Sequence, residues 1–119
     1  MTAPVLDVVC LCAQWCGNCR DYLPVFESMR ERFSGLARLT WIDIEDQSEV
    51  LGETEVENFP TLLILRGELP LFLGPLTPQP AMLAQLVQSA LDGRLPVQAD
   101  PALQALAGRV RQHLVDSIF

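Results

Sequence analysis

The chain carries two cysteines three positions apart in the stretch Ala13-Gln14-Trp15-Cys16-Gly17-Asn18-Cys19-Arg20. An apolar run comes before this stretch and a helical pattern follows it. A chain that leaves a strand and enters a helix here has Cys16 at the helix N-terminus and Cys19 one turn further on. The unpaired N–H groups and the positive end of the helix dipole then favour a thiolate on Cys16. The stretch therefore predicts a reactive dithiol that can close a small disulfide ring.

The composition predicts one globular domain and excludes several kinds of partner. The chain has 119 residues, of which 50% are apolar, so it is long enough to bury a single core. Eight basic residues against 15 acidic ones give a formal net charge of −7. Such a chain repels phosphate backbones and anionic membrane surfaces, so we expect neither nucleic acid nor membrane as a partner.

The N-terminal residues do not have the pattern of a signal peptide. Met1 to Val9 contains no basic residue and carries Asp7 in its apolar part, and no apolar run is long enough to span a bilayer. We therefore expect a cytoplasmic protein. In that reducing compartment the four cysteines are expected to be catalytic or metal-binding rather than structural disulfides.

The first half of the chain predicts a parallel strand–helix–strand unit. An apolar, β-branched strand over residues 5–12 leads into a helix over 17–33, and an alternating strand follows over 37–44. Pro24 lies inside the helix and should kink it. The apolar residues that recur there at spacings of three and four are Leu23, Phe26, Met29 and Phe33.

The second half predicts a hairpin and two helices. Residues 61–65 and 69–73 read as antiparallel strands, and Pro70 marks the second as an edge strand. Thr77-Pro78 and Asp100-Pro101 are both helix start signals, and Gly93 is a stop signal. The remaining expected segments are a short helix around 48–52, a linker at 94–99 and an apolar stripe within 102–118. The fold class is therefore α/β, with a mixed sheet of about four strands flanked by helices on both faces.

Several features together resemble the thioredoxin family. Trp15-Cys16-Gly17-Asn18-Cys19 is similar to the family's Trp-Cys-Gly-Pro-Cys motif, and Pro24 falls where the family has the proline that bends the active-site helix. Phe59-Pro60-Thr61 resembles the loop whose cis-proline faces the two cysteines, and Gly74 resembles the family's glycine after the last strand. The resemblance covers roughly residues 3–93. It predicts a thioredoxin-like domain over residues 1–93. The resemblance says nothing about residues 94–119, which we expect from their own pattern to form a linker and a helix packed on the same domain.

The resemblance implies a thiol–disulfide oxidoreductase that acts on protein disulfides without a cofactor. Cys16 would be the attacking thiolate and Cys19 the resolving thiol. Arg20 would help to hold the thiolate, and Trp15 would give a partner an apolar surface on which to dock. Gly17 and Asn18 lie between the two cysteines and support them. A reductase that recharges the dithiol is the other expected partner.

The substrate-binding residues implied by the resemblance lie in the second half of the chain. Pro60, if its peptide bond is cis, would present the backbone of Phe59 and Thr61 to an extended substrate segment, which adds to it like a strand. Gly74 is expected to bind substrate together with this loop.

The sequence also departs from the family pattern. Asn18 replaces the proline between the cysteines, Cys10 stands where the family has a buried aspartate, and Trp41 stands where its partner lysine is expected. The family's first strand and helix have no counterpart before Cys16, and residues 95–119 are additional. Without the buried carboxylate, the candidates to accept the proton of Cys19 are water, Asp43 and Glu45.

Other interpretations of these residues stay open. Cys16 and Cys19 could form half of a zinc site, which only Cys10, Cys12 and His113 could complete. Cys10 and Cys12 lie on the same face of a buried strand and should not converge with the pair at the helix start, so no metal is expected. Cys10 and Cys12 are expected to be small core residues; auxiliary redox thiols are the alternative.

Three further features have a structural and a functional interpretation. The acidic stretch 43–57 is expected to be a solvated face, or else a rim that selects basic partners, and His113 is expected to be structural. The stripe of residues 102–118 should pack on a bare sheet face in a monomer; the alternative is a dimer contact. For the whole chain, the alternative to an enzyme is a binding module that uses a groove between Trp15 and Pro60.

Overall fold

The computed structural model describes residues 6–12, 17–43, 61–67, 69–75 and 80–116. The helix expected around 48–52 lies outside the described residues. The elements, in chain order, are β1 (Leu6–Cys12), α1 (Gly17–Arg32), β2 (Ala37–Asp43), β3 (Thr61–Arg66), β4 (Leu69–Pro75), α3 (Pro80–Leu91) and α4 (Pro101–Asp116).

The strands form one mixed sheet with the order β2-β1-β3-β4. β1 is parallel to β2 and antiparallel to β3, and β3 is antiparallel to β4. β4 lies at one edge of this sheet, as Pro70 predicts, and the register shifts by one residue opposite it, between Ile64 and Leu65. The predicted fold class is confirmed.

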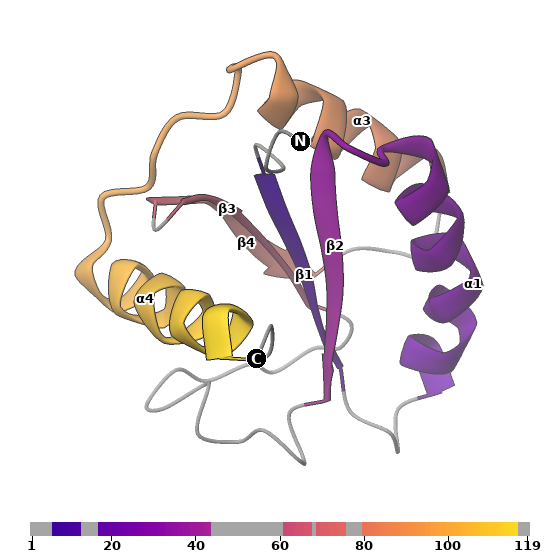
Figure 1. Cartoon of the computed structure of the whole chain (residues 1–119), viewed down its shortest axis with the longest axis horizontal. Helices are drawn as coiled ribbons and strands as arrows, with labels where there is room; N and C mark the ends of the chain where they lie inside the picture. The colour runs from indigo at the N-terminus through magenta and orange to yellow at the C-terminus, as the bar shows by residue number, and fades with distance from the viewer. Residues whose placement is uncertain (1–5, 13–16, 44–60, 68, 76–79, 117–119) are drawn as a thin grey trace.

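Apolar side chains cover both faces of the sheet. Alternate residues of a strand point to opposite faces, so Val8 belongs to one core cluster and Val9 to the other. α1 and α3 cover the face of Val8, and α4 covers the face of Val9 (Figure 1). The helical residues of the first cluster are Tyr22, Phe26, Met29, Leu83, Ala84, Val87 and Ala90, and those of the second are Leu106, Ala107, Val110 and Leu114.

The buried face of α1 differs by one position from the predicted one. Leu23 is 41% exposed, whereas Tyr22 is fully buried and packs with Phe26 at a ring centroid distance of 6.3 Å. Positions 22, 26, 29 and 33 keep the same side of a 3.6-residue helix facing the sheet, and position 23 is turned away from it. The helix continues through Pro24.

Local signals account for the ends of the last two helices. Gly93 has φ 76°, and the N–H of Arg94 donates to the carbonyl of Ser89 at 2.9 Å, which closes the C-terminus of α3. The Asp100 carboxylate accepts from the N–H of Ala102 at 2.9 Å and caps α4. The predicted cap at Thr77-Pro78 lies outside the described residues.

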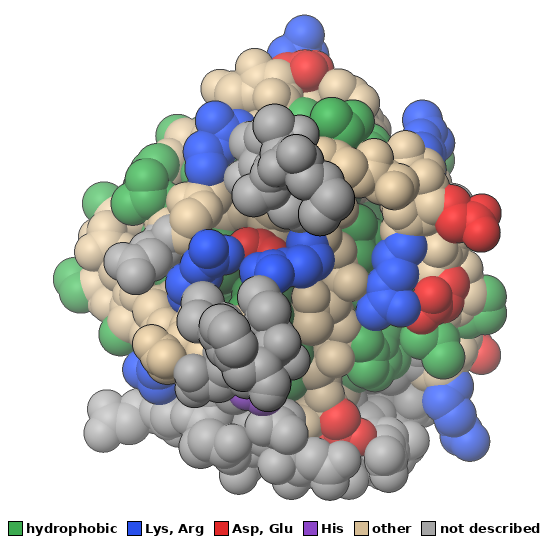
Figure 2. All heavy atoms as spheres, in the orientation of Figure 1, with side chains coloured by type: hydrophobic (Ala, Val, Ile, Leu, Met, Phe, Trp, Pro, Cys, Tyr) green, Lys and Arg blue, Asp and Glu red, His purple; other side chains and the backbone are tan. Residues whose placement is uncertain are grey.

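One carboxylate ties α4 to the sheet. Asp7 of β1 is 5% exposed and accepts from Arg38 of β2 and from Arg111 of α4, each at 2.7 Å. Figure 2 shows basic side chains around an acidic one in the region between α4 and β2. A buried acid in an otherwise apolar strand needs such partners. The sequence carried the signal, since Asp7 interrupts the first apolar run, but not the identity of the two arginines.

Candidate functional site at the carboxyl edge of the sheet

Several chain segments come together at one edge of the sheet. β1 and β2 are parallel and end side by side, with Cys12 opposite Asp43. β3 begins at the same edge with Thr61, and β4 ends there with Pro75, opposite Thr61. α1 starts at Gly17, soon after the end of β1, at the lower edge of the sheet in Figure 1. The carboxyl edge of parallel strands is where α/β proteins commonly place ligands.

Two of the predicted substrate-binding residues lie at this edge. Thr61 is the first residue of β3, is 4% exposed, and stands opposite Leu11 of β1. Gly74 of β4 stands opposite Leu62, the residue after Thr61. A Cβ atom built on Gly74 would lie 3.2 Å from Cζ of Phe72, so any larger residue there must displace that ring.

The dithiol motif lies only partly within the described residues. Gly17, Asn18 and Cys19 open α1, and Arg20 on the same first turn is exposed. That turn carries no acidic residue, which suits a thiolate near it. Trp15, Cys16, Phe59 and Pro60, as well as the acidic residues of 44–57, lie outside the described residues, so their roles stay predictions.

Cys10 and Trp41, at which the chain departs from the family pattern, are direct neighbours. They stand opposite each other on β1 and β2 and belong to the same core cluster. The Trp41 ring meets the Phe26 ring edge-on, with centroids 5.7 Å apart. Where the family resemblance leads one to expect an acid and a lysine, this chain therefore has an apolar contact between the sheet and α1.

Cys10 and Cys12 are core residues, as predicted. They are 0% and 2% exposed, and their Sγ atoms lie 3.1 Å apart on the face of the sheet that α1 and α3 cover. The described part of the chain contains no group of three His, Cys, Asp or Glu side chains that could hold a metal ion. His113 belongs to α4, across the sheet from the two cysteines, so it does not join them.

Tyr22 is a buried polar residue that the sequence did not single out. It is 0% exposed, and its hydroxyl finds no hydrogen-bond partner within the described ranges. Burial, followed by the nearby charges of Cys10 and Cys12, raises the pKa of Tyr22 well above its usual value. Position 22 falls at the i+4 spacing before Phe26, which is the signal that could have identified it as buried.

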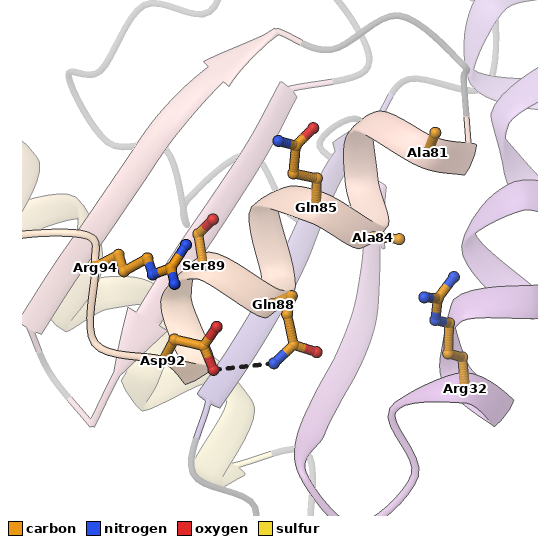
Figure 3. Close-up of a pocket in the computed structure, with 8 residues that line it drawn as sticks. All are labelled: Arg32, Ala81, Ala84, Gln85, Gln88, Ser89, Asp92 and Arg94. Atoms are coloured by element: carbon orange, nitrogen blue, oxygen red, sulfur yellow. Dashed lines mark hydrogen bonds between the residues drawn. The ribbon is translucent and has the colours of Figure 1, made fainter.

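One hollow in the described part of the chain lies elsewhere on the molecule. A groove of about 400 Å³ runs between the end of α1 and the length of α3, where Arg32, Gln88 and Arg94 line it (Figure 3). Asp92, also in its wall, accepts from Gln88 at 3.0 Å. Arg32 stands at the end of α1 opposite to its start at Gly17, so the groove is separate from the edge described above.

No helix within the described ranges is long and apolar enough to cross a membrane.

The fold and this edge define an α/β protein with a mixed sheet between helical layers. Comparison with known proteins supports the same fold class. The family model described as Thioredoxin matches residues 3–72. This is more than half of the chain, which therefore belongs to the thioredoxin family.

Individual relatives match over shorter segments. Thioredoxin H2-1 of Oryza sativa subsp. japonica is 39% identical over 62 residues, which are 52% of this chain and 44% of that protein. Thioredoxin of Bacillus subtilis is 33% identical over 54 residues, 45% of this chain and 52% of that protein. The chain thus spans about half the length of the curated relatives it matches.

Solved structures share the fold. The germline-specific thioredoxin Deadhead of Drosophila melanogaster superposes with a TM-score of 0.64 at 24% identity, covering 71% of this chain and 79% of that one. Fasciola hepatica thioredoxin gives 0.62 at 22% identity, with 70% and 78% covered.

Proposed function

We propose that this protein exchanges disulfides with protein substrates through Cys16 and Cys19. The observation that carries the proposal is that α1 begins at Gly17, directly after Cys16, next to the edge where β1 and β2 end. A thiol at a helix N-terminus is stabilised as the thiolate, which is the reactive form. Membership of the thioredoxin family supports the same chemistry.

The reaction has two exchange steps. The Cys16 thiolate attacks one sulfur of a substrate disulfide, forms a mixed disulfide and releases the other substrate sulfur as a thiolate. Cys19 then loses its proton and attacks the Cys16 sulfur, which releases the second substrate thiolate and leaves a Cys16–Cys19 disulfide. Two electrons pass to the substrate, and a reductase returns them to the pair. We further propose that this cycle runs in the cytoplasm.

The remaining predicted residues would hold the substrate or support the two thiols. Trp15 and the loop of Phe59, Pro60 and Thr61 would form the docking surface. Gly74 lies in the neighbouring strand, one position from the residue opposite Thr61. Arg20 adds positive charge on the first turn of α1, and Gly17 and Asn18 keep the two thiols one turn apart. Asp43, which ends β2 at this edge, is one candidate to take the proton of Cys19.

Reduction of insulin disulfides by dithiothreitol tests the activity. We expect the wild type to accelerate precipitation of the insulin B chain and Cys16→Ser to be inactive. Glu27→Gln, an exposed change on α1, is the matched control and should keep the full rate. A Cys16→Ser variant as fast as the wild type would disprove the enzyme and favour the binding module.

Trapping separates the roles of the two cysteines. Cys19→Ser removes the resolving thiol, so a disulfide between Cys16 and the substrate should accumulate and should be visible on a non-reducing gel. Cys16→Ser should trap nothing. If Cys16→Ser trapped substrate and Cys19→Ser did not, the assigned roles would be reversed.

A further inference from the structure

Cys10 and Cys12 form a second pair of thiols, in the interior of the molecule. They stand two positions apart on β1, so both side chains point to the same face of the sheet. Their Sγ atoms are 3.1 Å apart, which is only about 1 Å more than the ~2.05 Å of a disulfide bond. We propose that this pair is a redox centre of its own, which is oxidised reversibly to a disulfide within the strand.

The core cluster around the pair also contains a buried hydroxyl group. Tyr22 of α1 lies in the same core cluster, and its buried hydroxyl makes no hydrogen bond to any described residue. Burial and the charges of the two cysteines raise the pKa of Tyr22, so its hydroxyl stays protonated at neutral pH. The phenol makes no hydrogen bond to either thiol in this structure, so it remains free to donate one to a thiolate, which is the form in which either cysteine must react.

A small disulfide can serve as the oxidant of the Cys10/Cys12 pair. One thiol of the pair loses its proton and attacks the disulfide, which gives a mixed disulfide and one free thiolate. The second thiol loses its proton and attacks the sulfur of the first, which forms the Cys10–Cys12 bond and releases the other half of the oxidant as a thiolate. Two electrons pass to the oxidant, and its two thiolates take up the two protons.

The strand limits how stable this disulfide can be. β1 is held on both sides, since Cys10 stands opposite Trp41 of β2 and Leu62 of β3. The backbone between the two cysteines therefore cannot bend freely to suit the new bond. A disulfide under such restraint is more easily reduced, so we expect it to form under oxidising conditions and to reopen with a mild thiol. Because both sulfurs are buried, exchange should be slower than at an exposed thiol.

A variant without the other two cysteines isolates this pair. Cys16→Ser/Cys19→Ser is equilibrated with mixtures of 2-mercaptoethanol and its disulfide, unfolded in acid, labelled with N-ethylmaleimide and weighed by mass spectrometry. As the oxidised form of the reagent increases, we expect a species that has lost two hydrogens and takes up no label. Added 2-mercaptoethanol should restore two labels. Because the variant lacks Cys16 and Cys19, the result does not depend on whether those residues exchange disulfides.

A variant that keeps only one cysteine of the pair provides the matched control. Cys12→Ala in the same background leaves Cys10 alone, so it can take up one label or one mixed disulfide but cannot lose two hydrogens within one chain. The Cys16→Ala/Cys19→Ala background repeats the measurement, and circular dichroism shows which background is folded. Two labels at every ratio of the reagent in a folded background, or mixed disulfides alone, would overturn the proposal.

Discussion

Asp7 shows how a single side chain can join two layers of this protein. Its side chain is 8% exposed and pairs with Arg38 and Arg111, whose side chains are 32% and 34% exposed. Asp7→Asn would leave the two guanidinium groups facing each other without the charge between them. We expect a loss of about 2 kcal/mol in the free energy of unfolding, between the values for buried and exposed ion pairs. Urea unfolding measures it.

The exposed pair of Glu27 and Arg30 is the control for this prediction. Its side chains are 50% and 40% exposed at the same 2.7 Å separation. Glu27→Gln should cost less than about 0.5 kcal/mol. Equal losses for Asp7→Asn and Glu27→Gln would show that burial does not strengthen the Asp7 pairs.

Tyr22 should lower the stability of the folded protein at alkaline pH. Its pKa in the folded protein is raised above the value of about 10 for an unfolded chain. Between these two values the unfolded state binds fewer protons, so the free energy of unfolding should fall as the pH rises above about 10. Tyr22 is the only tyrosine in the sequence, so phenolate absorbance reports on it alone.

We expect this absorbance to appear only as the protein unfolds. Tyr22→Phe should remove this contribution to the alkaline loss. It should also leave the free energy of unfolding at neutral pH unchanged or higher, because it removes a buried hydroxyl without a partner in the described part of the chain. A phenol that titrates near pH 10 in the folded protein would contradict the prediction.

At the level of elements, α4 supplies the apolar layer on one face of the sheet. Leu106 is 0% exposed and packs in the cluster that contains Val9 and Leu63. Leu106→Ala should cost about 3 kcal/mol, since it removes buried methyl groups and leaves a cavity. The same change at Leu36, which is 50% exposed, should cost less than about 0.5 kcal/mol.

Urea unfolding with circular dichroism distinguishes the two variants. If Leu106→Ala were as mild as Leu36→Ala, α4 would not be contributing to the core. The division of the chain into residues 1–93 and 94–119 is a separate matter and stays a prediction.

For the whole molecule, the two clusters should unfold together. They lie on opposite faces but share β1 and β3, so neither can lose its sheet without the other. Val87 of α3 and Val110 of α4 are both fully buried, one in each cluster. Val87→Ala and Val110→Ala should each cost about 2 kcal/mol, and the double variant should show one transition with the two costs added. Separate transitions for the two helices would contradict this.

Much of the fold could be predicted because its signals are local. Alternation, helical spacing, Gly93 and Asp100-Pro101 each specify an element or its end from neighbouring residues. Leu23 was assigned to the buried face of α1, but it is exposed. Positions 22 and 23 lie four and three residues before Phe26, so both fit the helical spacing, and only packing against the sheet shows which of them is buried. The partners of Asp7 could not be predicted, since Arg111 lies 104 positions away and no local pattern links them.

The site was predictable to a different degree. The cysteine motif and the Pro60 loop were proposed from their order in the chain and stay predictions, since Cys16 and Pro60 lie outside the described residues. Thr61 and Gly74 do lie in adjacent strands. The contact of the two sulfurs of Cys10 and Cys12 could be foreseen only in part. Alternation gives them a common face, but their 3.1 Å separation depends on side-chain rotation inside the core.

The pairing of Asp7 with Arg111 also has a consequence for synthesis on the ribosome. The strand that carries Asp7 is made early, and the helix that covers its face is made about a hundred residues later. Until then, one side of the growing sheet has no layer from α4 to shield it. Exposed apolar surface of this kind promotes aggregation, so the nascent chain should depend on chaperones until α4 has left the exit tunnel.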